Sequence, residues 1–405
     1  MNLGRRDFVR LAHAGMAALP LAGTAVFAQN AVFEGPKLKI GLIGCGGRGS
    51  WISTLFKAHG GFEFVAVSDY FQERSQRVGE VLGVAADKRF AGLDGYKRVM
   101  ESGVEAVVMQ TPPWFFPGFA ETAIKAGLHV YMAKPVAVDI PGTLKIRELA
   151  DKAGKSGQVF LSDYQLPVDP VNMEVCKRVR SGALGRLQAV FSSGWAGGNG
   201  YQDPPLGDTI SSRIKDLVWC NDIPLGGDYI VHYDIHIIDA IIWALGRKPV
   251  GAMGASAAFR PSVHGDARDS SMVTYQFEDG MLWSHQGILG MYHDWIRSGR
   301  LTASLQGTQA SACLSYAGKS YVRGGSRHFS GGVPNPAQSV RTNIDSFYNL
   351  IGDGDTSNQA VKRAVESNLT AILGREAAAR RKYVELSELI RENRALQPDL
   401  SGLTA

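Results

Sequence analysis

Residues 37–49 read KLKIGLIGCGGRG. The apolar run 37–43 is typical of a buried β-strand, and it leads directly into the G-x-G-x-x-G pattern of residues 44–49. In this pattern Gly44 permits a tight turn, Gly46 lets the backbone approach a pyrophosphate, and Gly49 lets a helix pack against the strand. Residues 50–59 are expected to form that helix, whose first N–H groups favour a bound phosphate. The stretch therefore predicts a dinucleotide-binding turn.

A second apolar run, residues 62–68, ends at Asp69, twenty positions beyond Gly49. A carboxylate at this strand end accepts hydrogen bonds from ribose hydroxyls and repels a 2′-phosphate, so NAD is favoured over NADP as the cofactor. Further apolar runs alternate with helical stretches: strands are expected at 104–109, 128–132 and 158–162, and helices at 118–126 and 142–153. This alternation predicts an α/β Rossmann domain with a mostly parallel sheet over residues 36–163.

Ligands of such sheets bind at the carboxyl ends of the strands, so the residues that follow each strand are candidates for one binding rim. The expected cofactor contacts are Gly44, Gly46, Gly47, Arg48, Gly49, Asp69, Thr111, Pro112, Trp114, Lys134 and Gln165. Asp163 and Tyr164 follow the strand 158–162 and are expected to face a substrate.

Four motifs resemble those of the Gfo/Idh/MocA oxidoreductases: GCGGRG at 44–49, TPPWFFP at 111–117, AKPVAVD at 133–139 and GGDYIVHYDIH at 226–236. The resemblance implies that Lys134 lies between the nicotinamide and the substrate and binds the reacting hydroxyl. The family usually has Glu-Lys-Pro where this chain has Ala133-Lys134-Pro135, so the carboxylate that precedes the lysine is absent. The ending 367–378 is similar to that of exported members of the family.

A largely apolar helix is expected over residues 228–245, and His232, His236 and Asp239 fall on one face of it. The two histidines fit three roles: core residues with satisfied hydrogen bonds, a metal-binding pair, or proton transfer. No third metal ligand is evident, and no metal is expected. The resemblance favours catalysis, with His236 as the general acid/base beside Lys134. It makes His232 a candidate substrate contact, with Asp234 two residues away. Trp195 is a further candidate, because aromatic faces suit the C–H surfaces of sugars; a place in the core of the domain interface is the alternative.

The second domain, residues 164–336, is expected to be α+β, with a large, mostly antiparallel open-faced sheet. Strands are predicted at 250–258, 270–277, 281–287, 300–306 and 310–316, with a hairpin turn at 278–280. Residues 324–336 are rich in Gly, Ser and Pro and are interpreted as a long loop. The remaining residues, 337–405, are expected to include helices at 339–351 and 359–379 that pack back on the first domain.

Residues 1–28 are predicted to be a twin-arginine signal peptide. Arg5-Arg6 resembles the export motif, an apolar stretch covers 11–27, and a cleavage site follows Ala28. This route carries folded proteins, so we expect a periplasmic or secreted protein that travels with a tightly bound nucleotide and has no stable membrane anchor. The net charge of +5 is small for 405 residues, and no basic run indicates a nucleic-acid partner.

These features predict an NAD(P)-dependent oxidoreductase that acts on a secondary hydroxyl of a sugar, glycoside or cyclitol. One alternative is a redox-neutral glycosidase or lyase that oxidises, eliminates, hydrates and reduces its substrate. A sugar–sugar transhydrogenase is a further alternative, and a binding protein that keeps NAD for structure alone is the last. Family analogy also implies a homo-oligomer.

Overall fold

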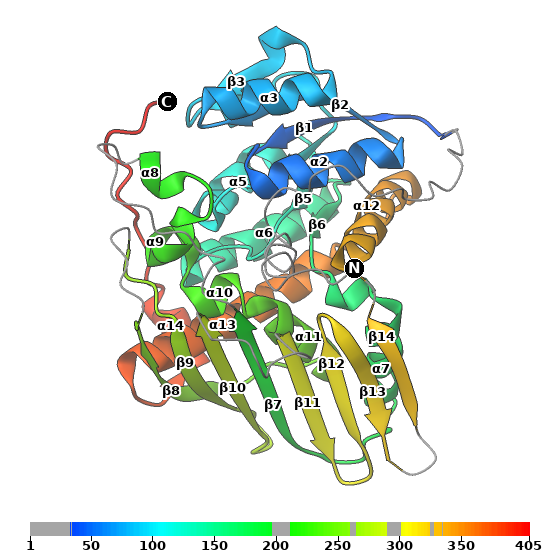
Figure 1. Ribbon diagram of the computed structural model, residues 1–405, viewed down its shortest axis with the longest axis vertical. Coiled ribbons are helices and arrows are strands. Elements are labelled where there is room, and N and C mark those ends of the chain that lie inside the picture. Colours follow the sequence, from blue (N-terminus) through cyan, green and yellow to red (C-terminus); the bar gives the residue numbers. More distant parts are fainter. Residues whose placement is uncertain are drawn as a thin grey trace, which may run out of the picture.

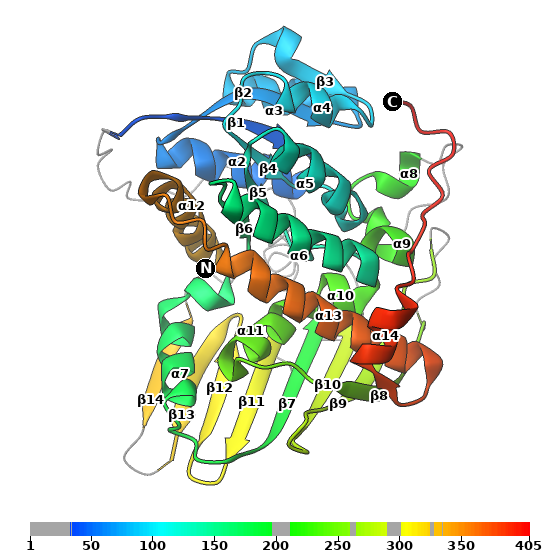
Figure 2. The same ribbon diagram turned by 180° about the vertical axis from the view of Figure 1, so that it is seen from behind.

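The computed structural model describes residues 33, 35–196, 211–259, 265–289, 301–324, 328–333 and 335–405. These residues form two domains, each built on one sheet (Figures 1 and 2). The predicted signal segment 1–28 lies outside the described residues. Among the helices that are described, none is long and apolar enough to cross a membrane.

The first domain holds a six-stranded sheet in the order β3-β2-β1-β4-β5-β6. Every pairing in it is parallel, which confirms the predicted Rossmann fold. Its strands are β1 (Leu38–Ile43), β2 (Phe62–Asp69), β3 (Arg89–Ala91), β4 (Ala106–Met109), β5 (His129–Met132) and β6 (Phe160–Ser162). The strand order reverses at β1 and β4, so a crevice is expected where these two strands end.

Helices cover both faces of this sheet. They are α2 (Gly47–His59), α3 (Gln72–Leu82), α4 (Gly95–Met100), α5 (Phe116–Lys125) and α6 (Ile140–Lys155), with 3₁₀ turns η1 (Ala86–Lys88) and η2 (Pro113–Phe115). Helix α6 shows how local sequence sets an element's start: Asp139 caps it by accepting a hydrogen bond from the N–H of Gly142 at 2.8 Å. Pro141 then occupies the first turn, where no backbone donor is needed.

The second domain holds a nine-stranded sheet in the order β14-β13-β12-β11-β7-β10-β9-β8-β15. Only the pairing of β7 with β10 is parallel. The strands are β7 (Leu187–Ala196), β8 (Gly251–Ala257), β9 (Ser270–Gln276), β10 (Leu282–Leu289), β11 (Leu301–Gly307), β12 (Ser311–Ser315), β13 (Gly318–Arg323), β14 (Phe329–Val333) and β15 (Val384–Glu385). The predicted mostly antiparallel sheet is thus confirmed.

Helices α7 (Pro170–Arg180) and α11 (Ile235–Leu245) pack on one face of this sheet, and the other face is open (Figures 1 and 2). Two details differ from the prediction. The central strand β7 was not foreseen, and β14 lies inside the predicted loop 324–336, because its glycine-rich sequence pairs with β13. The shorter elements are η3 (Leu166–Val168), α8 (Ser211–Ile214), η5 (Val218–Asn221), α9 (Ile223–Gly226) and α10 (Tyr229–His232).

The last long helices connect the domains. Helix α12 (Pro336–Asp353) packs against α2, whereas α13 (Gln359–Arg380) contacts α6 and β6 of the first domain and α11 and β8 of the second. Figure 2 shows α13 running between the two layers. Its buried Arg375 donates from Nη1 to the carbonyl oxygens of Val138 at 2.7 Å and Gly227 at 3.1 Å. Buried polar groups of α13 therefore hold the two domains together.

Helix α13 is also bonded to α11 through the buried Asp239. This carboxylate accepts from Ser367 Oγ at 2.7 Å and from Arg363 Nε at 3.1 Å. Asp239→Ala leaves the hydroxyl and the guanidinium without their acceptor, and we expect it to lower the free energy of unfolding by about 3 kcal/mol. Denaturant titration measures this change. Asp151→Ala, which removes an exposed ion pair between α6 and Lys362 of α13, is the control and should cost less than about 1 kcal/mol. Equal costs would contradict the interpretation.

Candidate active site

The glycine-rich turn has the close backbone approaches that a diphosphate cradle needs. Gly44 has φ +95°, and a Cβ there would lie 2.5 Å from the carbonyl oxygen of Gln110. A Cβ on Gly49 would overlap the carbonyl oxygen of Gly44. At Gly46, the N-cap of α2, a Cβ would meet only Arg74 Nη1 at 3.5 Å, and no side chain caps the helix. The first amides of α2 therefore remain available to an anion.

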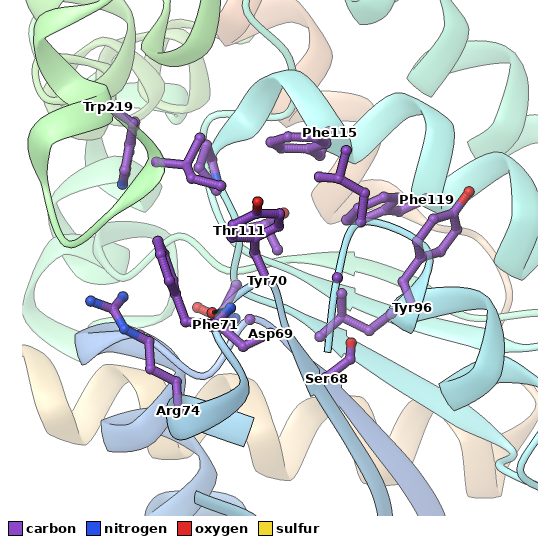
Figure 3. Close-up of a pocket in the computed structure, with 18 of the residues that line it drawn as sticks. Ser68, Asp69, Tyr70, Phe71, Arg74, Tyr96, Thr111, Phe115, Phe119 and Trp219 are labelled. Atoms are coloured by element: carbon purple, nitrogen blue, oxygen red, sulfur yellow. Dashed lines mark hydrogen bonds between the residues drawn. The ribbon is translucent and has the colours of Figure 1, made fainter. Parts of the chain in front are cut away.

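A pocket opens beside this turn (Figure 3). Both domains line it: the first contributes the turn, the ends of β2 and β4 and several aromatic rings, and the second contributes residues near η5. The lining residues are Ile43, Gly44, Gly46, Ser68, Asp69, Tyr70, Phe71, Arg74, Gly92, Leu93, Tyr96, Gln110, Thr111, Pro112, Phe115, Phe119, Ile214, Asp216 and Trp219. A groove with polar groups at the turn and aromatic rings beyond it fits a dinucleotide.

Asp69 lies in this pocket at the end of β2. Its carboxylate accepts from the backbone N–H of Cys45 at 2.7 Å and of Phe71 at 3.0 Å, so it also fixes the glycine-rich turn. Burial raises the pKa of Asp69, while these two N–H groups act in the opposite direction. Two carboxylate oxygens offer about four acceptor positions, which leaves capacity for ribose hydroxyls.

Arg74 also lines the pocket and was not foreseen from the sequence. Its guanidinium pairs with Asp216 of the second domain at 2.6 Å and stands 4.9 Å from the centre of the Phe71 ring. Figure 3 shows Arg74, Phe71 and Asp69 on the same side of the pocket. Arg74 lies in the first turn of α3, five residues after Asp69, and this short spacing in the sequence was the available signal. A cation near the ribose end weakens the repulsion that Asp69 exerts on a 2′-phosphate.

Lys134 follows β5 at the same edge of the sheet. Its Nζ donates to the carbonyl oxygen of His232 at 2.6 Å. Desolvation, and secondarily the positive charge of Arg48, lower the pKa of Lys134 to about 7. Ala133, which stands where the resemblance implies a glutamate, is buried and brings no charge. A backbone carbonyl of the second domain therefore orients this lysine.

The predicted helix 228–245 is in fact two helices, α10 and α11, separated at Tyr233 and Asp234. His232 ends α10, and its Nδ1 lies 3.0 Å from the carbonyl oxygen of Asp228. His236 lies in the first turn of α11. The two histidines therefore do not share one helix face, and the structure gives them different environments.

His236 is buried, with its ring centre 4.8 Å from that of Tyr316 and 6.4 Å from that of Tyr164. Burial first, and then the positive charges of Lys134 and Arg48, lower the pKa of His236 well below its usual value. Its Nδ1 has no hydrogen-bond partner among the described residues, and neither have Thr111 Oγ1 and Tyr164 Oη. A neutral imidazole with an unsatisfied nitrogen is suited to accept a proton.

Arg48 forms an ion pair with Asp163, which is fully buried. Asp163 also accepts from Gln165 Nε2 at 3.0 Å and from Asn343 Nδ2 of α12 at 2.7 Å. Tyr316, which was not foreseen as a site residue, donates to Gln165 Oε1 at 3.2 Å. Asp163 was expected to face a substrate; in the structure its carboxylate accepts hydrogen bonds from Arg48, Gln165 and Asn343 and so anchors Arg48.

Three further expected contacts are displaced from the site. Asp234 turns toward the sheet, where its Oδ2 lies 2.9 Å from Nε2 of His285 on β10. Trp195 follows Gly194, whose missing Cβ faces Asp234, so strand alternation directs Trp195 to the open face of the sheet. The indole N–H of Trp114 donates to the carbonyl oxygen of Leu396 at 2.9 Å, and Trp114 does not line the pocket. Within the described part of the chain, no cluster of metal-ligating side chains is present.

Residues 38–161 match the model of the Gfo/Idh/MocA oxidoreductase family, described as an NAD-binding Rossmann fold. The chain is 29% identical over 247 residues to inositol 2-dehydrogenase 4 of Saccharopolyspora erythraea. It is 24% identical over 241 residues to 2,7-anhydro-N-acetylneuraminate hydratase of Mediterraneibacter gnavus. These matches cover 61% and 59% of this chain and span 65% and 58% of the relatives' lengths.

Solved structures share the two-domain fold. A levoglucosan dehydrogenase in complex with NADH superposes with a TM-score of 0.70 at 17% identity, over 86% of this chain and 99% of its own. An aldose–aldose oxidoreductase from Caulobacter crescentus gives a TM-score of 0.68 at 19% identity, with the same two coverages. Over its NAD-binding domain, residues 38–161, the chain therefore matches the Gfo/Idh/MocA family of oxidoreductases.

Proposed function

We propose that this protein oxidises a secondary hydroxyl of a sugar, glycoside or cyclitol, with a tightly held NAD as the oxidant. One observation carries the proposal: Lys134 and His236, both with lowered pKa, lie close enough to Arg48 for its charge to act on them, and Arg48 belongs to the glycine-rich turn that fits a dinucleotide. The relatives named as inositol 2-dehydrogenases support a polyhydroxylated ring as the substrate.

When it is bound, the nicotinamide ring supplies the acceptor for the hydride that leaves the carbinol carbon. His236 takes the hydroxyl proton at its unsatisfied Nδ1. Lys134 donates a hydrogen bond to the same substrate oxygen and stabilises the negative charge that develops there. The ion pair with Asp163 holds Arg48 close enough for its charge to act on both groups.

Asp69 supports NAD rather than NADP, because its carboxylate lies where ribose hydroxyls are expected. Arg74, on the same rim, supports the opposite preference. We infer that NAD binds, since the Arg74 charge is already neutralised by Asp216.

A redox-neutral glycosidase or lyase is the second candidate, and one observation favours it: a relative is named as a hydratase of an anhydro sugar. The same lysine and histidine would serve transient oxidation, elimination, hydration and reduction. Such chemistry regenerates the nucleotide in each cycle, which suits a protein that leaves the cell with its cofactor bound.

The N-terminal residues support that location. We propose export by the twin-arginine route, on the strength of Arg5-Arg6 and the apolar stretch that follows. The open face of the second sheet carries exposed apolar side chains, including Phe191, Met253 and Met272, and this supports assembly into a homo-oligomer.

Loss of either catalytic group should abolish turnover without releasing the nucleotide. We expect Lys134→Met and His236→Ala each to lower kcat by about 10²–10⁴-fold, the range that one acid–base group contributes. The absorbance and mass of nucleotide released on denaturation would identify the cofactor and should match those of the unchanged protein. Lys177→Met, an exposed lysine on α7, is the control. Turnover retained in both variants would refute the assignment.

The pH dependence follows from the two lowered pKa values. Oxidation needs neutral His236 and protonated Lys134, and both forms coexist because the pKa of His236 lies below that of Lys134, which is about 7. We therefore expect kcat/KM for oxidation to fall as pH rises through about 7. Lys134→Arg keeps the cation and should remove this fall in the activity that remains. A rise through the same pH range would instead assign the base role to Lys134.

The two candidate reactions differ in their products. We expect incubation with excess NAD and a panel of inositols and sugars to give NADH and ketone in equal amounts, followed by absorbance at the NADH band. An aryl glycoside that releases its aglycone without net NADH would favour the redox-neutral reaction. Bound NAD with neither product from any substrate would argue for a binding protein.

A further inference from the structure

The segment 394–405 follows α14 (Leu386–Glu392) and runs along the outside of the molecule. Figures 1 and 2 show it in red, passing α9 and α8 of the second domain and ending beside the first domain. Most of its side chains are exposed, and only Leu396, Pro398, Leu400 and Leu403 are half-buried. It is therefore held by a few specific contacts rather than by a core.

The first anchor of the segment lies at two of the sequence motifs, residues 111–117 and 133–139. The N–H of Leu396 donates to Asp139 Oδ2 at 2.7 Å, and the Leu396 carbonyl accepts from Trp114 Nε1 at 2.9 Å. Asp139 also caps α6, and Trp114 immediately precedes Phe115 in the pocket wall. This end of the segment is thus tied to the elements that follow β4 and β5.

Its second anchor lies on the rim of the nucleotide pocket. The N–H of Leu93 donates to the Thr404 carbonyl at 3.0 Å, and the N–H of Thr404 donates to Tyr70 Oη at 3.4 Å. Gly92 has φ +85°, and a Cβ there would overlap the carbonyl oxygen of Ala405. Tyr70, Gly92 and Leu93 all line the pocket, and Figure 3 shows Tyr70 beside Asp69.

We propose that segment 394–405 is a strap that closes the pocket beside Asp69 and must undock before a nucleotide enters or leaves. The inference rests on the proposed function in one respect, that a pyridine nucleotide occupies this pocket. Segments with few buried contacts open locally at much lower cost than the whole fold. The strap slows exchange of the cofactor while leaving the chemistry to Lys134 and His236.

The rate at which bound nucleotide is released measures the effect of the strap directly. A variant that ends at Asn393 keeps α14 and loses both anchors. Loaded with NADH and chased with excess NAD, it should release NADH roughly 10–100-fold faster than the full chain, because the four hydrogen bonds of the two anchors are lost and each contributes little once water replaces it. Trp114→Phe loses a single hydrogen bond and should give a smaller acceleration. Gln397→Ala, an exposed residue within the strap, is the matched control and should leave the rate unchanged.

The unchanged protein provides a second readout that needs no truncated variant to fold. Hydrogen exchange of residues 394–405 should slow when NADH is bound. Equal release rates for the full chain, the truncated variant and Trp114→Phe would overturn the strap, and so would exchange that NADH does not alter. Neither result would contradict the proposal that a pyridine nucleotide binds in the pocket. Failure of the full chain to bind any pyridine nucleotide would overturn the strap and the proposed function together.

Discussion

The hydrogen bond from Lys134 Nζ to the carbonyl oxygen of His232 joins the two domains at the candidate catalytic lysine. Ala133 supplies no carboxylate to orient the ammonium, so its direction depends on a backbone oxygen at the end of α10. The position of α10 relative to β5 thus determines where the lysine donates. It also determines the charge that His236 experiences, because Lys134 is among the causes of that histidine's lowered pKa.

The end of α10 is in turn fixed by Asp234, which packs on the helix-covered face of the second sheet. Asp234 contacts His285, whose Nδ1 lies 2.8 Å from Ser192 Oγ, and Trp283 Nε1 donates to that same hydroxyl at 2.7 Å. Since the indole can only donate, the serine hydroxyl is free to donate to Nδ1, which leaves the Nε2 proton of His285 for Asp234. The carboxylate fits because Gly194 and Gly287 pair across β7 and β10, and a Cβ on either would overlap it. A buried polar chain therefore sets the break between α10 and α11.

The sequence predicted those parts of the site that depend on local pattern. The glycine-rich turn, Asp69 and Lys134 each follow a strand directly, and their relative positions come from a parallel sheet. Contacts between distant segments were not accessible in this way: Asp234 and His285 are 51 residues apart, and Trp114 and Leu396 are 282 apart. The largely apolar stretch 228–245 concealed the helix break at Tyr233 and Asp234, because the helical spacing of His232, His236 and Asp239 continues across it. Strand β14 was missed because its stability comes from pairing with β13 rather than from its own composition.

These constraints decide how a nucleotide can reach the pocket, which both domains line. Opening the domains as a hinge would break the bonds of Arg375 to Val138 and Gly227, all of them inside the interface that α13 fills. Buried hydrogen bonds without replacement partners are expensive to lose. The Arg74–Asp216 pair and the contacts of segment 394–405 lie instead at the periphery, where water can replace them. Breaking these outer contacts is therefore the less costly route for nucleotide exchange. It leaves the relative positions of Lys134 and His236 unchanged.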